Sequence, residues 1–142
     1  MQQKIVRIKP FLSACAIGAA LALTASAQSA VTSVTETPGN YSRDTTVTGA
    51  NGKTATYQNN AAWANGAYTD NRSVTGFNGK TATYQNNRAW GNGSYSDTKS
   101  YTGFNGATRT DSVSRSGGLV SNTYTGRNGN SRTFVRSARF RR

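Results

Sequence analysis

The sequence predicts an all-β protein, an antiparallel up-and-down meander of about eight strands built from double-hairpin repeats of about 27 residues. Three observations support this: Asn-Gly dipeptides recur along the chain, they separate runs rich in Thr, Val, Tyr and Trp, and one long segment is repeated. Asn-Gly between such runs is a strong hairpin signal, because both residues tolerate positive φ. The chain shows no apolar pattern of 3.6-residue period, and this argues against helices.

The N-terminal segment has the pattern of an export signal. Three basic residues precede an apolar run at 11–23, which is followed by Ala25-Ser26-Ala27. We therefore expect residues 1–27 to be a secretory signal peptide, so the protein is predicted to reach the periplasm, the cell surface or the extracellular space. An apolar run of about 13 residues is shorter than the ~20 that span a bilayer. No stable membrane insertion is expected after signal cleavage.

An irregular leader is predicted at 28–40, a single β-repeat domain at 41–140, and a basic C-terminal tail at 136–142. Within the domain, residues 48–74 and 75–101 agree at 19 of 27 positions, and less regular copies begin near 102 and 125. A fixed period of this length indicates one small unit multiplied, with each copy packing on the next.

Seven turns divide the domain, since six Asn-Gly pairs are joined by one Gly-Gly pair in the remaining position. Seven turns imply eight antiparallel strands. The expected strands are 41–49, 53–64, 67–76, 80–91, 94–103, 107–116, 119–126 and 130–140.

The register follows from the turn types. A two-residue hairpin places Trp90 opposite Tyr95, and a three-residue loop with a bulge at 76–80 places Val74 opposite Ala82. Alternation of these two turns keeps one face continuous through all eight strands. That face collects the aromatic residues and nearly all mid-strand charges, whereas the other face consists almost entirely of Thr, Ser, Asn and Gln.

Neither face resembles an ordinary core, because charges and hydroxyl groups gain little by leaving water. Three architectures are therefore open: a single-layer meander wet on both sides, a small closed barrel, or a sheet that stacks on copies of itself. The register shifts by two residues for every two strands, which over eight strands approaches the shear of a small barrel. We expect a meander that curls toward closure, with stacking through the neutral polar face as the alternative.

Composition excludes most enzyme chemistry. The chain has no His, its one Cys lies inside the predicted signal, and only five acidic residues are present. The usual bases, nucleophiles and metal ligands are missing, so we expect no enzyme activity, no cofactor and no metal. Without the three basic residues of the signal, 14 Lys and Arg stand against five acids, a net charge of +9. Such charge favours polyanions, such as acidic polysaccharide, lipopolysaccharide or nucleic acid, or simply keeps a sheet soluble.

The pattern TGxNGKT, followed by TYQNN and WxNGxY, resembles short secreted proteobacterial proteins with tandem G-x-N-G hairpin repeats. The resemblance covers residues 48 to about 133. It implies export and a β architecture, and it implies no particular activity. The third copy lacks the Tyr-Gln-Asn-Asn and Trp elements, which argues against a function that needs them in every copy.

Interleaved aromatic and basic residues are the best candidates for binding, because rings stack on sugars or bases while cations hold acidic groups. The candidates within the repeats are Trp63, Tyr68, Arg72, Arg88, Trp90, Tyr95 and Lys99. The candidates near the C-terminus are Arg132, Arg136, Arg139, Arg141 and Arg142. Alternatively, the Trp-Tyr pairs only hold the hairpins together, and the arginines form a solvated tail.

Two functions are consistent with these features. The first is an exported, non-enzymatic structural protein of the cell surface or matrix, which acts by self-association and by contact with acidic polymers. The low-charge segment TATYQNN, at 54–60 and 81–87, suits assembly or an ordinary polar strand. The second is a monomeric binding module for an anionic glycan or nucleic acid. Salt distinguishes them, because screening weakens polyanion binding but promotes association of like-charged sheets.

Overall fold

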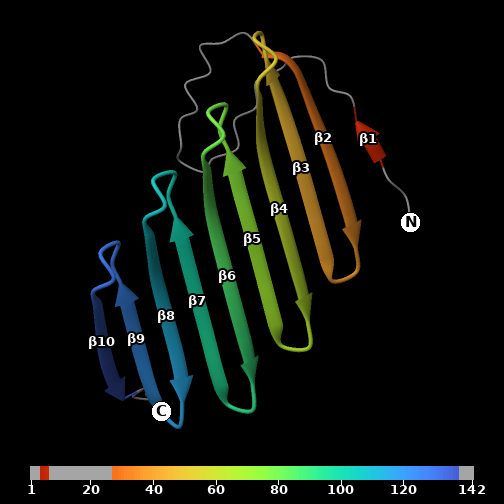
Figure 1. Cartoon of the computed structure of the whole chain (residues 1–142). Coiled ribbons are helices and arrows are strands. Elements are labelled where there is room, and N and C mark those ends of the chain that lie inside the picture. The colour runs from red at the N-terminus through yellow and green to blue at the C-terminus, as the bar shows by residue number, and fades with distance from the viewer. Residues whose placement is uncertain (1–3, 7–26, 138–142) are drawn as a thin grey trace.

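In the computed structural model, which describes residues 4–6 and 27–137, the chain forms one antiparallel sheet with its strands in sequence order (Figure 1). The predicted all-β up-and-down meander is confirmed. No helix long and apolar enough to cross a membrane occurs in the described residues. The strands are β1 (Lys4–Val6), β2 (Ala27–Thr37), β3 (Asn40–Gly49), β4 (Thr54–Ala64), β5 (Ala67–Thr75), β6 (Thr81–Gly91), β7 (Ser94–Thr102), β8 (Thr108–Ser116), β9 (Leu119–Thr125) and β10 (Ser131–Ser137).

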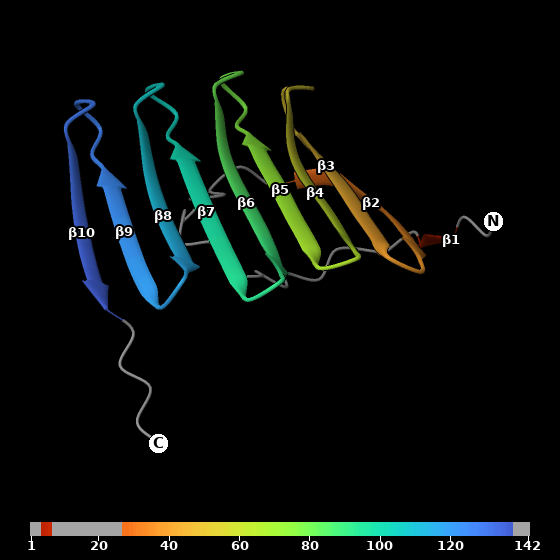
Figure 2. The same ribbon diagram turned by 90° about the horizontal axis from the view of Figure 1, so that it is seen from below.

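The sheet is open rather than closed. Within the described residues, β10 pairs only with β9, and β2 has only the three-residue β1 on its outer side. Figure 2 shows the long strands side by side in a single layer, with β2 and β10 at opposite ends. The expected curling toward a barrel is not found. Nine long strands make β2 and β10 run in the same direction, so these two edges cannot join as an antiparallel pair.

The additional long strand comes from a segment that was predicted to be irregular. Residues 28–40 were expected to form a leader, and this expectation is wrong: β2 pairs with β3 from Ala27 to Thr37. A Pro38-Gly39 turn joins the two strands, with Gly39 at φ 80°. Proline presets φ at the first central position of a turn, and glycine tolerates positive φ at the second.

The predicted signal peptide lies mostly outside the described residues. Its described residues are β1 and Ala27, the first residue of β2, and β1 pairs with β2 so that Ile5 lies opposite Ser33. The eight predicted strands are all present as β3 to β10, and their predicted bounds agree with the observed ones within one residue up to residue 137. The tail beyond residue 137 lies outside the described residues.

Two kinds of turn alternate, as predicted. Two-residue turns connect β2–β3, β4–β5, β6–β7 and β8–β9 at one end of the sheet, and longer loops connect β3–β4, β5–β6, β7–β8 and β9–β10 at the opposite end (Figure 1). In the loop at 76–80, the Gly76 N–H donates to the Lys80 carbonyl at 2.9 Å, and the Gly79 N–H donates to the Gly76 carbonyl at 2.9 Å. The Asn78 carboxamide accepts a bond from the Lys80 N–H at 3.1 Å. This is the bulged hairpin that the register required.

The register is also confirmed, since Val74 lies opposite Ala82 and Trp90 lies opposite Tyr95. Residues directly opposite each other share a face of the sheet, so each face can be followed from strand to strand. We call the first face the basic-aromatic face. On β3 to β10 its charged and aromatic members are Tyr41, Arg43, Tyr57, Trp63, Tyr68, Asp70, Arg72, Tyr84, Arg88, Trp90, Tyr95, Asp97, Lys99, Tyr101, Arg109, Asp111, Arg115, Tyr124, Arg132, Phe134 and Arg136.

We call the opposite side of the sheet the polar face, because Thr, Ser, Asn and Gln dominate it on β3 to β10. Asp44 is its one charged residue on these strands, and Leu119 and Val135 are its large apolar ones. A conventional core is not present in the described part of the chain, where Ala55 and Val120 are the buried apolar residues. Strand pairing and contacts within the basic-aromatic face therefore hold the sheet together.

Candidate anion-binding surface

A row of directly opposed side chains crosses the basic-aromatic face from β3 to β8, and at β7 and β8 it reaches the end of the sheet that carries the longer loops. Each member is the Cα partner of the next, because the alternating turns keep the register continuous across six strands. The row consists of Arg43, Asn59, Arg72, Tyr84, Tyr101 and Arg109. It contains three cations and no carboxylate.

Tyrosine and arginine side chains stack on one another at the centre of this row. The rings of Tyr84 and Tyr101 lie 4.9 Å apart at a tilt of 48°. The Arg72 guanidinium lies over Tyr84, 5.4 Å from the ring centroid, and the Arg109 guanidinium lies over Tyr101 at 4.6 Å. Such cation–π contacts orient the guanidinium groups, and each is worth roughly 0.5–1 kcal/mol at an exposed site.

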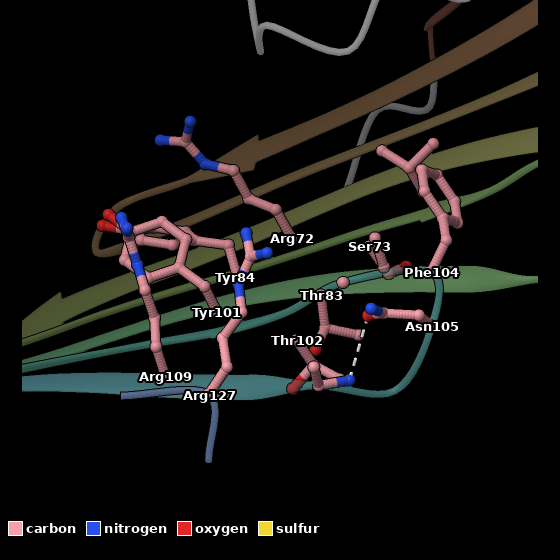
Figure 3. A pocket seen from close by; sticks show the side chains of 14 residues that line it. Arg72, Ser73, Thr83, Tyr84, Tyr101, Thr102, Phe104, Asn105, Arg109 and Arg127 are labelled. Atoms are coloured by element: carbon pink, nitrogen blue, oxygen red, sulfur yellow. Dashed lines mark hydrogen bonds between the residues drawn. The ribbon is translucent and has the colours of Figure 1, made fainter. Parts of the chain in front are cut away.

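A half-open groove of about 830 Å³ lies over this row. Arg72, Tyr84, Tyr101 and Arg109 line its sheet side. Phe104, from the β7–β8 loop, and Arg127, from the β9–β10 loop, complete its loop end. Figure 3 shows Tyr84, Tyr101, Arg109 and Arg127 gathered together, with Phe104 and Asn105 further along the loop. The groove therefore combines three guanidinium groups with aromatic walls. We call it the arginine groove.

Burial affects the ionisation of this part of the face. The pKa of Tyr84 is raised mainly by burial, and the nearby Tyr101 adds to this effect. The pKa of Arg72 is raised chiefly by its hydrogen bonds to Asp70. Tyr84 is thus neutral and Arg72 is charged at neutral pH. Because Arg72 is paired with Asp70, the excess positive charge of the groove comes from Arg109 and Arg127.

Three cations predicted as binding residues are already engaged by buried carboxylates. Residue Asp70 is 3% exposed, and its carboxylate accepts hydrogen bonds from Arg72 Nε at 2.9 Å and Nη2 at 2.6 Å. Residue Asp97 is 8% exposed, and its carboxylate lies 3.3 Å from Arg88 Nε and 3.4 Å from Lys99 Nζ. The predicted pairing of Trp90 with Tyr95 implies that Arg88 lies opposite Asp97, and the structure confirms this. Arg88 and Lys99 therefore share one carboxylate, whereas Arg72 has the Asp70 carboxylate to itself.

The predicted Trp-Tyr pairs are found, and the backbone of each tryptophan also connects neighbouring hairpins. Trp63 lies opposite Tyr68 and Trp90 opposite Tyr95, and the two indoles are 44% and 50% exposed. The backbone N–H of Trp63 donates a hydrogen bond to the Gly39 carbonyl at 2.8 Å. The same contact recurs one repeat later in Trp90. Each tryptophan residue thus ties its strand to the turn of the preceding hairpin.

The remaining predicted cations lie away from the arginine groove. Arg132 and Arg136 are exposed on β10, opposite Tyr124 and Val120. The other three predicted arginines, Arg139, Arg141 and Arg142, lie outside the described residues. The structure thus brings the predicted residues Tyr68, Arg72, Arg88, Tyr95 and Lys99 together on one face and leaves Arg132 and Arg136 at its edge.

Sequence reasoning missed Tyr84, Tyr101, Phe104, Arg109 and Arg127. Arg109 and Arg127 are exposed, and neither lies within 4.0 Å of a carboxylate in the described part of the chain. A signal for the row was present in the predicted register, since Trp90 opposite Tyr95 implies that Tyr84 lies opposite Tyr101 on the same two strands. The loop residues Phe104 and Arg127 gave no such signal, because their position depends on how the longer loops fold over the sheet.

No metal-binding group of three or more His, Cys, Asp or Glu side chains occurs in the residues that the structure describes. No protein-family model matches the chain, and no curated protein or solved structure matches it significantly. Fold and side-chain geometry are therefore the basis for inferring what this protein does.

Proposed function

We propose that this protein is an exported, non-enzymatic structural protein of the cell surface or extracellular matrix, which associates with copies of itself and contacts acidic polymers. The observation that carries the proposal is the separation of charge between the two faces of a single-layer sheet. On β3 to β10 the basic-aromatic face bears eight cations and three carboxylates, a net charge of +5, whereas the polar face bears Asp44 alone.

The polar face favours self-association. Its hydroxyl groups form cross-strand pairs beside the longer loops, with Thr75–Thr81, Thr102–Thr108 and Thr125–Ser131 oxygens each 2.8 Å apart. A flat, nearly uncharged face with ordered Thr, Asn and Gln side chains has the composition of a dry interface between stacked sheets. The basic-aromatic face cannot stack on itself in this way, because two faces of charge +5 repel.

The exposed edge offers a second route to association, but its charge opposes it. All seven residues of β10 are exposed, and an unpaired strand edge is a template for another strand. Arg132 and Arg136 lie on that edge, and like charges suppress edge-to-edge pairing of identical strands. Stacking through the polar face is therefore the favoured mode.

A monomeric binding module for an anionic polymer is the second candidate. The arginine groove favours it, because a preformed concave site with convergent polar groups is typical of ligand binding. The two functions are compatible in one molecule, since the groove and the polar face lie on opposite sides of the sheet.

Static light scattering of residues 28–142, followed over days at low and moderate salt, tests self-association. We expect the mass to grow, and to grow faster in salt, because screening reduces the repulsion between copies. The variant Gln85→Lys with Asn87→Lys puts two charges on exposed positions of the polar face and should prevent the growth. The matched variant Gln85→Thr with Asn87→Thr keeps the face neutral and should associate like the parent. A constant monomer mass would contradict self-association and leave the binding module.

A further inference from the structure

We propose that the arginine groove is a specific binding site for a carboxylate-bearing segment of an acidic polysaccharide. This inference rests on the proposed function, because it locates the polymer contact at Arg72, Arg109 and Arg127, with Tyr84, Tyr101 and Phe104 as walls. It differs from a general attraction of the whole basic protein to polyanions, because it requires particular side chains.

Two cations of the groove, Arg109 and Arg127, are available to a ligand. Arg109 and Arg127 are exposed and have no carboxylate within 4.0 Å among the described residues. Arg72 is engaged by Asp70 through two hydrogen bonds, so it lines the groove as a paired cation. Guanidinium groups present a planar fork that matches a carboxylate with two parallel hydrogen bonds, and this geometry makes such contacts both strong and selective.

The other basic clusters lack this combination. Arg88 and Lys99 share the buried Asp97, so a ligand carboxylate would compete with an existing ion pair. Arg132 and Arg136 lie on the exposed strand β10 and do not line the arginine groove. The arginine groove is the place where unpaired cations and a concave surface coincide.

The covering of the tyrosine rings favours a polysaccharide over a nucleic acid. Proteins that bind single strands without sequence preference stack successive bases on open aromatic faces. Here guanidinium groups lie over Tyr84 and Tyr101, and the two tyrosines also face each other, so Phe104, 39% exposed, is the one well-exposed ring of the groove. A sugar segment does not need a series of open rings. A volume of about 830 Å³ suits a short oligosaccharide, since small-molecule sites span about 300–1,000 Å³.

Isothermal titration calorimetry, which measures the affinity for a short oligogalacturonate, tests the site. The uncharged methyl ester of this ligand and a single-stranded oligothymidylate are the comparison ligands. The groove variant is Arg109→Gln with Arg127→Gln. The matched control is Lys53→Gln with Lys80→Gln, which removes the same charge from exposed loop positions at the same end of the sheet but outside the groove. Thermal unfolding of each variant verifies that the sheet is intact.

We expect oligogalacturonate to bind the parent protein. The methyl ester of oligogalacturonate should not bind. The groove variant should lose at least about tenfold in affinity, as expected for lost guanidinium–carboxylate pairs, and the control should lose less than about threefold. Light scattering should show that both variants associate alike, because the polar face is unchanged. This readout separates failure of the groove from failure of self-association.

Three results would overturn the site. Equal loss in the two double variants would mean that binding depends only on overall charge. Tighter, groove-dependent binding of oligothymidylate would replace the polysaccharide with a nucleic acid. No binding of any probe to the parent would refute both the groove and the polymer contact, while leaving self-association to be judged by its own measurement.

Discussion

The turn residue Gly66 lies directly against the backbone of Trp90 in the neighbouring hairpin. The backbone N–H of Trp90 donates a hydrogen bond to the Gly66 carbonyl at 2.7 Å, and a Cβ atom placed on Gly66 would collide with the Trp90 carbonyl oxygen. Gly66 also has φ 77°. Its equivalent in the next repeat, Gly93, has φ 71° but no atom within 4 Å of such a Cβ. The two glycines thus differ in contact but not in conformation.

The first prediction compares alanine at these two glycines. Gly93→Ala should cost about 1–2 kcal/mol in free energy of unfolding, the cost of a Cβ in the left-handed region. Gly66→Ala should cost roughly 3–5 kcal/mol, because the turn must also move away from Trp90. Urea unfolding of the two variants measures both values. Equal losses would show that the contact between hairpins contributes nothing.

The second prediction concerns the buried carboxylate of Asp97, which also accepts a hydrogen bond from the Tyr95 hydroxyl at 3.2 Å. Asp97→Asn should lower the free energy of unfolding by about 1–3 kcal/mol, because Arg88 and Lys99 lose their partner but stay partly hydrated. Asp111→Asn is the control, since Asp111 forms no ion pair within 4.0 Å among the described residues. Its effect should stay within about 0.5 kcal/mol. Similar losses would contradict a special role for Asp97.

The third prediction concerns alkaline pH. Burial raises the pKa of Tyr68 and of Tyr84 above the ordinary value of 10.0, and the Asp70 carboxylate adds to the effect at Tyr68. The folded state then holds these protons more tightly than the unfolded chain does, so their stabilising contribution is complete below pH 10 and is lost as pH rises through the folded pKa. Phenolate absorbance should show late-ionising tyrosines that disappear in Tyr68→Phe with Tyr84→Phe. Tyrosines that all titrate together near pH 10 would refute the shift.

The fourth prediction uses the open edge. Amide protons that point outward from β10 should exchange fast, and those of the central strand β6 should exchange slowly, because β6 is paired on both sides. Hydrogen exchange measured by NMR on the monomer tests this difference. Assembly by stacking through the polar face should leave the β10 amides fast. Protection of β10 on assembly would instead indicate pairing between edges.

The regular part of the fold could be predicted from sequence because turn chemistry fixes register. Asn-Gly at a two-residue turn and Gly-x-Asn-Gly at a bulged loop each permit one arrangement of the flanking strands, so Val74 opposite Ala82 and Arg88 opposite Asp97 followed without any knowledge of packing. No Asn-Gly or Gly-Gly pair marks the turn between β2 and β3. That turn is Pro38-Gly39, in which a rigid proline presets one residue and only Gly39 has positive φ, so the turn signal that identified the other strands is absent at β2.

The candidate site was harder to predict. Arg88 and Lys99 were predicted as binding residues because basic and aromatic residues alternate around them. Composition does not show that the Asp97 carboxylate engages both cations. Arg109 lies in the third copy of the repeat, which is less regular than the first two. Arg127 belongs to the β9–β10 loop, which reaches a groove formed mainly by other strands. Proximity of this kind depends on loop conformation, which the strand pattern does not determine.

The alternation of short and long turns also has an evolutionary consequence. A pair of strands with one turn of each kind begins and ends in the same orientation, so duplication or loss of such a pair leaves every other side chain on its original face. Each event changes the width of the sheet by about 9–10 Å, twice the spacing of neighbouring strands. Unequal recombination between the near-identical copies at 48–74 and 75–101 could therefore lengthen or shorten the protein in a single step, with no redesign of a core.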